Sequence, residues 1–189
     1  MLELRALASF ASLAVVAGFV VAASPPASVL ASEIGAPSVP VDAKPDFKLD
    51  GGKLVLPGPI VFKTASDAID EDKSKASLEH VRAYLEAKTY ITLMRIEGHA
   101  DSDGSAAASQ TLTEKRAMSV AKWLVANKVD CKRVLPVGFG SSKPIAPNDT
   151  AENKAKNRRI DFVNAKLNGK DIGGLPPEGS GKVAGDPCK

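Results

Sequence analysis

The run ITLMRIEGHADSDG, residues 91–104, decides the fold of this chain. Its first half is mostly apolar, and Met94 and Ile96 then alternate with charged residues, which is the pattern of a β-strand with one well-buried face. The strand is predicted over 90–98 and runs directly into the polar loop 99–104. Because ligand sites in α/β sheets lie beyond the carboxyl ends of strands, this loop is the first candidate for a functional site.

Helical periodicity flanks this strand on both sides. Upstream, apolar residues recur at helical spacing and predict an amphipathic helix over 74–88. Downstream, residues 117–124 carry one apolar helical face, and Thr113 stands where an N-cap residue would begin that helix. Arg116 is then predicted one turn into the second helix.

The remaining elements complete an alternating pattern. A β-rich run over 53–62 is interrupted by two prolines, which predicts a sheet edge or a bulge. A strand is predicted over 133–140, a short polar helix over 151–157 and a last strand over 159–163. The order β, α, β, α, β, α, β predicts an α/β (α+β) fold in which helices pack on a mixed four-stranded sheet.

Composition limits the class of protein. The chain has 189 residues, 44% of them hydrophobic and 25% charged, which fits one globular domain and excludes both a disordered chain and a multi-span membrane protein. The net charge is only +3, and six Phe, two Tyr and one Trp are too few to form stacking platforms between basic residues. We therefore expect no nucleic-acid partner.

The N-terminus has the composition of a targeting segment. Residues 6–23 are apolar apart from two serines, and small or apolar residues precede Ser32 at the positions that a signal peptidase reads. We expect residues 1–31 to be a signal peptide that is removed. The alternative is an uncleaved anchor, because about 18 apolar residues is close to the shortest span of a bilayer.

Three further segments follow from composition. Residues 32–45 contain three prolines among small residues and are predicted to form an extended linker. Residues 46–168 are the predicted domain. Residues 169–189 are rich in Gly and Pro and are predicted to be a flexible tail. Cys131 and Cys188 are the two cysteines of the chain, so an exported protein can oxidise them to a disulfide, or leave both as free thiols.

Asp101 and Arg116 are the residues whose chemistry suggests a ligand. They stand fifteen residues apart, at the strand exit and on the following helix, and both side chains are expected at the surface. A carboxylate and a guanidinium a few ångströms apart suit a zwitterion, because the guanidinium forms a bidentate fork with a carboxylate and the aspartate accepts from an ammonium. The alternative is a simple Asp–Arg salt bridge without a ligand.

Other sites fit the loop less well. A calcium loop beginning at Asp101 would have Ser105 at its third acidic position and Leu112 at its twelfth, where a Glu is needed. A zinc site lacks ligands, since the chain has only His80 and His99. A serine nucleophile lacks a Gly-x-Ser-x-Gly turn. We expect no metal, no cofactor and no catalysis, and a structural role for His99, whose ring would hold the loop by hydrogen bonds.

Several blocks of sequence together resemble the OmpA/MotB C-terminal domain, in order and with the spacing of that family, from Ile60 to Phe162. The blocks are Gly98-His99-Ala100-Asp101, Leu112-Thr113-Glu114-Lys115-Arg116-Ala117, Val137-Gly138-Phe139-Gly140, Pro144-Ile145-Ala146-Pro147-Asn148-Asp149-Thr150 and Asn157-Arg158-Arg159-Ile160. Chance does not explain so many ordered matches.

The resemblance implies an OmpA-like module that binds the peptidoglycan of the cell envelope through the diaminopimelate of its stem peptide. It assigns Asp101 to the ligand ammonium and Arg116 to its carboxylate, with Arg158 lining the pocket and Arg159 supporting the sheet edge. Support of the pocket is implied for His99, Ala100, Ser109, Leu112 and Asn157. It further implies a periplasmic or outer-membrane-associated protein with envelope partners; the oligomeric state stays open.

The sequence departs from the family pattern at four positions around the expected pocket. Lys63 stands where an Asp is usual, Ala65 replaces a polar residue, Ala100 replaces Thr and Ser109 replaces a common Asn. Each change removes or weakens a hydrogen bond near the ligand. The alternative function is a stator-like or secretion-system subunit anchored in the inner membrane, and cleavage of residues 1–31 discriminates between the two.

Overall fold

The computed structural model describes residues 46–173 and 181–189. The helices are α1 (Glu71–Ala87), α2 (Ala106–Ala126) and α3 (Ala151–Asn157), with a 3₁₀ turn, η1, at Cys131–Arg133. Three long strands are β3 (Ile91–Gly98), β4 (Val134–Gly138) and β5 (Ile160–Leu167). Four strands have two residues each: β1 (Leu49–Asp50), β2 (Lys53–Leu54), β6 (Lys170–Asp171) and β7 (Lys182–Val183).

The strands form one mixed sheet, which confirms the predicted fold class. The order is β1-β2-β5-β3-β4-β7, and β6 also pairs with β5. The central strand β3 is parallel to β4 and antiparallel to β5. Within the described residues the sheet has seven strands rather than the four predicted, because four of the seven have only two residues each. Of the predicted strand 53–62, only Lys53–Leu54 joins the sheet, since the prolines that follow cannot donate to a ladder.

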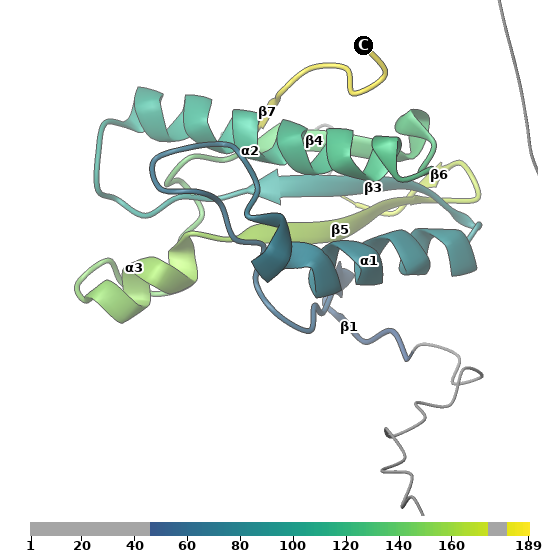
Figure 1. The fold of residues 1–189 in the computed structure, drawn as a ribbon, viewed down its shortest axis with the longest axis horizontal. Helices are drawn as coiled ribbons and strands as arrows, with labels where there is room; N and C mark the ends of the chain where they lie inside the picture. The colour runs from purple at the N-terminus through teal and green to yellow at the C-terminus, as the bar shows by residue number, and fades with distance from the viewer. Residues whose placement is uncertain (1–45, 174–180) are drawn as a thin grey trace, which may run out of the picture. The chain divides into compact units, whose positions relative to one another are not determined.

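Both long helices pack on one face of this sheet (Figure 1). The helix α2 lies along β4, and α1 lies along β5, where Asn164 Nδ2 donates to Tyr84 Oη at 2.8 Å. One core cluster joins apolar residues of both helices to alternate residues of the strands, such as Met94, Ile96 and Phe162. Arg95 and Glu97 alternate with Met94 and Ile96 along β3, so their charged side chains lie on the other face of the sheet.

The helix α2 begins earlier than predicted. Its N-cap is Ser105, whose hydroxyl accepts from the Ala108 N–H at 3.2 Å, so the predicted N-cap at Thr113 is wrong. Thr113 is fully buried two turns later, where its Oγ1 accepts the Gly140 N–H at 3.0 Å. Arg116 therefore lies about three turns into the helix rather than one.

Close packing fixes α2 against the ends of β3 and β4. A Cβ on Gly98 would lie 2.4 Å from the Thr113 carbonyl oxygen, and one on Gly138 would lie 2.6 Å from the Glu114 nitrogen. Real side chains do not tolerate such distances, so only glycine allows this approach. The loop that follows Gly98 is thereby held beside α2, and α3 lies at the same end of the sheet (Figure 1).

The predicted signal peptide and linker, residues 1–45, lie outside the described residues. Within the part that is described, no helix combines the length and the apolar character needed to cross a membrane. The described parts of the predicted tail, 169–173 and 181–189, contribute strands to the sheet. Here β6 pairs with β5, β7 pairs with β4, and Cys188 forms a disulfide with Cys131.

Candidate functional site

The loop after β3 is fixed by backbone hydrogen bonds to two other segments. The His99 N–H donates to the Arg159 carbonyl at 3.0 Å, and the Ala100 N–H donates to the Gly140 carbonyl at 2.8 Å. Asp101, the next residue, is therefore held in place and is buried, with 8% of its surface exposed. The expectation that Asp101 lies at the surface is wrong.

The Asp101 carboxylate already has two partners. Its Oδ2 accepts from Arg158 Nη1 in an ion pair, and its Oδ1 accepts from the Asp103 N–H at 3.0 Å. Burial opposes ionisation of this carboxyl, but the hydrogen bonds from Arg158 and Asp103 outweigh burial and hold the pKa of Asp101 below its usual value. Asp101 is therefore a fixed negative charge at neutral pH.

Arg116 is held by different groups. Its Nε donates to the Ser66 carbonyl at 3.1 Å, and its guanidinium carbon lies 4.8 Å from the centroid of the Phe62 ring. Burial and the neighbouring Arg158 charge lower the pKa of Arg116, although Asp67 and Asp101 act in the opposite direction. An arginine guanidinium does not lose its proton at neutral pH, so Arg116 stays charged.

The salt bridge that the sequence left open, between Asp101 and Arg116, is not formed. Among the described residues, Arg116 makes no ion pair, and its two terminal nitrogens make no hydrogen bond. Asp101 pairs instead with Arg158, which the sequence assigned to the pocket lining. Arg116 and Arg158 are close enough for each charge to affect the other, so the site holds two guanidiniums for one carboxylate.

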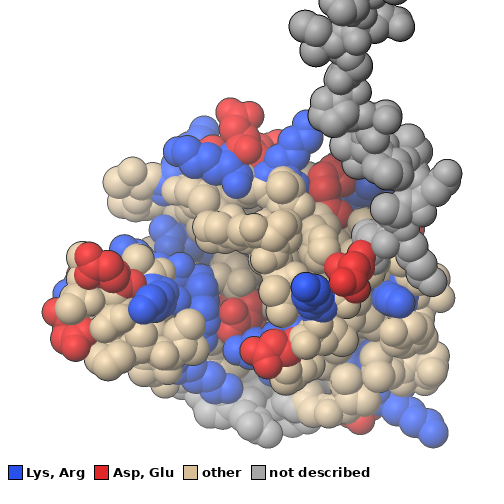
Figure 2. All heavy atoms as spheres, turned by 90° about the horizontal axis from the view of Figure 1, so that it is seen from below, with Lys and Arg blue, Asp and Glu red and all other residues tan. Residues whose placement is uncertain are grey.

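A small hollow of about 20 Å³ lies between these groups. Its lining residues are Ile60, Phe62, His99, Arg116, Arg158, Arg159 and Ile160. On the face of the molecule from which α3 projects, basic side chains edge a depression beside the α3 lobe (Figure 2). The site is thus cationic and open to solvent at its edge.

Asn157, expected to support the pocket, is fully buried and organises the neighbouring loop. Its Oδ1 accepts from the Ile145 N–H at 2.8 Å, and its Nδ2 donates to Asn148 Oδ1 at 3.0 Å. Asn148 in turn accepts the Ser102 N–H at 3.2 Å, directly beside Asp101. Asn157 therefore acts on the site through Asn148 rather than by touching it.

The other residues expected to support the pocket lie in the loop after β3 and on α2. Ser109 and Ala100 are buried, and Ser109 Oγ would lie 3.9 Å from a Cβ on Gly104. Leu112 lies on α2 beside Ala65 of the loop that carries Ser66. Arg159 immediately precedes β5, an inner strand of the sheet, and its Nε donates to Asp161 Oδ2 at 3.1 Å.

His99 does not hold the loop by hydrogen bonds of its ring. Its two ring nitrogens are buried and make no hydrogen bond of good geometry, although Nε2 lies 3.4 Å from Glu97 Oε2, and the ring stacks on Phe139 with centroids 5.3 Å apart. Burial outweighs the attraction of Glu97 and lowers the pKa of His99, so the ring is neutral at pH 7. The loop is held by the backbone of His99 instead.

Glu97, His99 and Asp161 bring ligand atoms within 4.8 Å of one another, which is the donor set of a metal site. Both carboxylates, however, are already bound by cations. Glu97 pairs with Arg95, while Asp161 Oδ2 lies 2.8 Å from Lys53 Nζ and also accepts from Arg159. A metal ion would have to displace these fixed charges, so we interpret the cluster as a buried ion-pair network.

Phe62 and Ser66 are site residues that the sequence reasoning missed. Ser66 acts through its backbone carbonyl, which no residue type signals. Phe62 was recognised as part of a β-rich run, but its stacking on Arg116 depends on a chain reversal over 62–69, where Phe62 bridges Ile69.

Comparison with known proteins assigns the chain to a family. A model of the OmpA family matches residues 61–158, more than half of the chain. Outer membrane protein A of Bordetella avium is 34% identical over 137 residues, which cover 68% of this chain and 66% of that protein. Peptidoglycan-binding protein ArfA of Mycobacterium tuberculosis is 44% identical over 68 residues, 36% of this chain and 21% of that protein.

The fold is also similar to that of a solved structure, the peptidoglycan-associated lipoprotein from Burkholderia pseudomallei. The TM-score is 0.50 at 28% identity, over 55% of this chain and 86% of that chain. The chain spans less than two thirds of the length of both curated relatives. The match to the family model nevertheless includes Asp101, Arg116 and Arg158. The chain belongs to the OmpA family.

Proposed function

We propose that the protein binds peptidoglycan non-covalently in the cell envelope and thereby tethers or stabilises the envelope. Two of the compared proteins are named for peptidoglycan, and one is an outer membrane protein. We further propose that Asp101 and Arg116 hold the ammonium and the carboxylate of diaminopimelate in the stem peptide, with Arg158 beside them.

The observation that carries this proposal is the way in which Arg116 is held by Ser66 and Phe62. Its Nε donates to the Ser66 carbonyl and its guanidinium lies over the Phe62 ring, which fixes the direction of the guanidinium. Its terminal nitrogens remain for a ligand, and they have the geometry of a carboxylate fork. A guanidinium that is fixed and half-buried, yet without a carboxylate partner among the described residues, is what a carboxylate ligand needs.

Asp101 supplies the second half of the recognition. Its carboxylate is ionised and now bound to Arg158, so an incoming ammonium shares Asp101 with that guanidinium. Arg158 can then turn toward the ligand carboxylate, because its side chain is 47% exposed. Each charge-assisted hydrogen bond contributes about 1.5–3 kcal/mol, which gives a modest affinity per site. The wall offers many identical sites, so retention follows from effective concentration.

Binding to purified sacculi tests the proposal. Removing the charge of Asp101 or shortening Arg116, with Asp101→Asn or Arg116→Ala, is expected to weaken binding by about 2–5 kcal/mol, because a partner of an ionised ligand group is lost. Arg116→Lys is also expected to weaken binding, since an ammonium cannot form the planar fork. Co-sedimentation measures binding to sacculi, and calorimetry measures binding of free meso-diaminopimelate.

Arg82→Lys on α1 is the matched control, because Arg82 pairs with Glu79 and Glu86 of its own helix and is remote from the loop after β3. It should bind as the unchanged protein does. Circular dichroism shows whether each variant is folded. If folded Asp101→Asn and Arg116→Ala proteins sediment with sacculi as well as the unchanged protein, the site assignment is wrong.

A further inference from the structure

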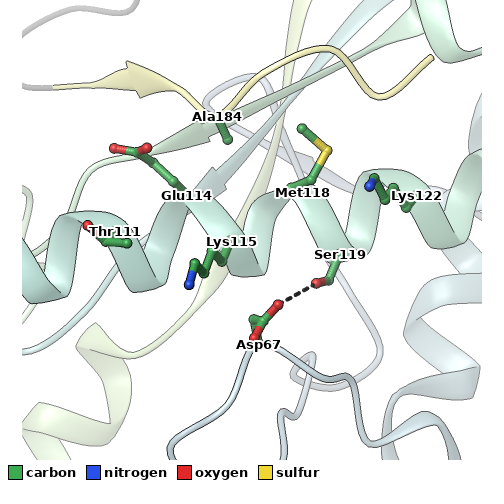
Figure 3. A pocket seen from close by; sticks show the side chains of 8 residues that line it. All are labelled: Asp67, Thr111, Glu114, Lys115, Met118, Ser119, Lys122 and Ala184. Carbon is green, nitrogen blue, oxygen red and sulfur yellow. Dashed lines mark hydrogen bonds between the residues drawn. The ribbon is translucent and has the colours of Figure 1, made fainter. Parts of the chain in front are cut away.

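The outer side of α2 carries a groove that is separate from the hollow at Arg116. Its volume is about 490 Å³, and its floor is formed by Thr111, Lys115, Met118 and Lys122 of α2. One wall is Asp67, and the other is Ala184 of the tail (Figure 3). Glu114 and Met118 lie on the same side of α2 as Ala184, whereas Lys115 lies on the side of Asp67.

The tail wall is fixed rather than loosely placed. The Ala184 N–H donates to the Pro136 carbonyl of β4 at 2.9 Å, and Val183 pairs with Val137 in the sheet. The disulfide to Cys131 closes this segment four residues later, at Cys188. The groove is thus a property of the folded, oxidised domain.

The groove continues toward the proposed diaminopimelate site. A second hollow of about 490 Å³ shares Asp67, Thr111 and Lys115 with the first and extends to Ala65 and Leu112. Ser66, between Ala65 and Asp67, is the residue whose carbonyl holds Arg116. One short loop therefore forms a wall of the groove and also positions the guanidinium.

Four charged side chains line this groove, Asp67 and Glu114 with negative charge and Lys115 and Lys122 with positive charge. Asp67 accepts from Ser119 Oγ at 3.5 Å, and Glu114 Oε1 accepts from Gln110 at 2.9 Å, with Lys182 Nζ at 3.5 Å. Lys115 and Lys122, by contrast, are exposed and have no ion-pair partner within residues 46–173 and 181–189. They stand seven residues apart, which is about 10 Å along the helix axis.

We propose that this groove is a second contact region for the same polymer, in which Lys115 and Lys122 bind carboxylates of the peptidoglycan peptide beyond diaminopimelate. The inference rests on the proposed function and deepens it. A polymer held at Arg116 has to leave the site across the adjoining surface, and the loop 65–67 leads directly into the groove. The free cations there match the carboxylates that a stem peptide carries, and the groove is open enough for an extended chain.

The test compares binding of the polymer and its fragment with binding of free meso-diaminopimelate. Lys115→Ala/Lys122→Ala is expected to weaken binding of a soluble disaccharide tetrapeptide, and of sacculi, by about threefold to tenfold, the range for two exposed ion pairs. Binding of free meso-diaminopimelate should not change, because that ligand does not reach the groove. Calorimetry measures the two soluble ligands, and co-sedimentation measures sacculi.

Lys48→Ala/Lys75→Ala is the matched control, since it removes the same charge from exposed positions outside both hollows. An equal loss in this control would show general electrostatic attraction and would overturn the inference. So would unchanged disaccharide-tetrapeptide binding by the Lys115→Ala/Lys122→Ala protein. In either case, meso-diaminopimelate binding that is lost in Arg116→Ala leaves the proposed function standing, so the two failures are distinguishable.

Discussion

Two glycines allow the helix that carries Arg116 to touch the sheet. At Gly98 and Gly138 the backbone of α2 occupies the space that a Cβ would need, with Thr113 and Glu114 as the opposing residues. Neither glycine is required for a positive φ. Their function is close approach, which places the start of the loop after β3 against the middle of α2.

Gly98→Ala is therefore expected to destabilise the domain. The added methyl would lie 2.4 Å from a backbone oxygen, which cannot rotate away, so the helix or the strand must shift. Overpacking of this kind costs about 1–3 kcal/mol, and a backbone contact belongs at or above the upper end. Urea unfolding followed by circular dichroism measures the loss.

Gly58→Ala serves as the control for that change. A Cβ at this position would meet Ser77 Oγ at 3.7 Å, an ordinary contact, so stability should hardly change. Equal unfolding midpoints for the Gly98→Ala and unchanged proteins would show that α2 can move away without cost.

The charged pair shows how far sequence reasoning reaches at the scale of single residues. The resemblance placed Asp101, Arg116 and Arg158 in one site, and all three lie together, with Arg158 on Asp101. Which arginine pairs with the aspartate could not be predicted. That choice depends on the register between β5 and β3, and the two paired residues are 57 positions apart in the chain.

At the scale of elements, α2 gives the clearest lesson. The sequence predicted its existence from the apolar face that begins at Ala117, but placed its start two turns too late. Its first turns, from Ala106, are alanine-rich and partly polar, and they face solvent, so hydrophobic periodicity gives no signal there. Thr113 was predicted as the cap from its place before that apolar face; its hydroxyl does accept a backbone N–H, but that N–H belongs to Gly140.

The N-cap of α2 at Ser105 leads to a prediction about the stability of the domain. Ser105→Ala removes the acceptor for the Ala108 N–H and should destabilise the domain by about 1 kcal/mol, the usual cost of losing a serine N-cap. Ser102→Ala is the control, because Ser102 is exposed and only its backbone bonds to Asn148. Thermal unfolding of both variants measures the difference. Equal transition temperatures would mean that water replaces the Ser105 hydroxyl at no cost.

At the scale of the whole molecule, C-terminal residues cover one edge of the sheet. The strand β7 lies on β4, which would otherwise be the outer strand of the sheet on that side. Exposed outer strands offer unpaired backbone groups to other chains, and covering them is a common protection. The sequence could predict that two cysteines exist to join, but not that the joined segment would form a strand, since β7 has only two residues and no apolar alternation.

Cys131 and Cys188 are separated by 57 residues, and this loop length sets the expected effect of the disulfide. Closing a loop of that size lowers the entropy of the unfolded chain and is worth about 4 kcal/mol of folding free energy in the chain-entropy description. Cys131→Ser/Cys188→Ser should therefore unfold at clearly lower urea concentration than the oxidised protein. A reducing agent should shift the oxidised protein in the same direction and leave the double variant unchanged.

The same variant should also release the tail. Without the disulfide, β7 keeps a two-residue ladder to Val137 and Gly138, the Ala184 N–H bond, and the exposed contact of Lys182 with Glu114. Exposed ion pairs contribute little, so these contacts alone should open frequently. Hydrogen exchange at Val183 and Ala184 is then expected to rise far more than exchange in β3. If protection at these residues and the urea midpoint both stay unchanged in the double variant, backbone pairing alone closes the molecule and the disulfide is dispensable.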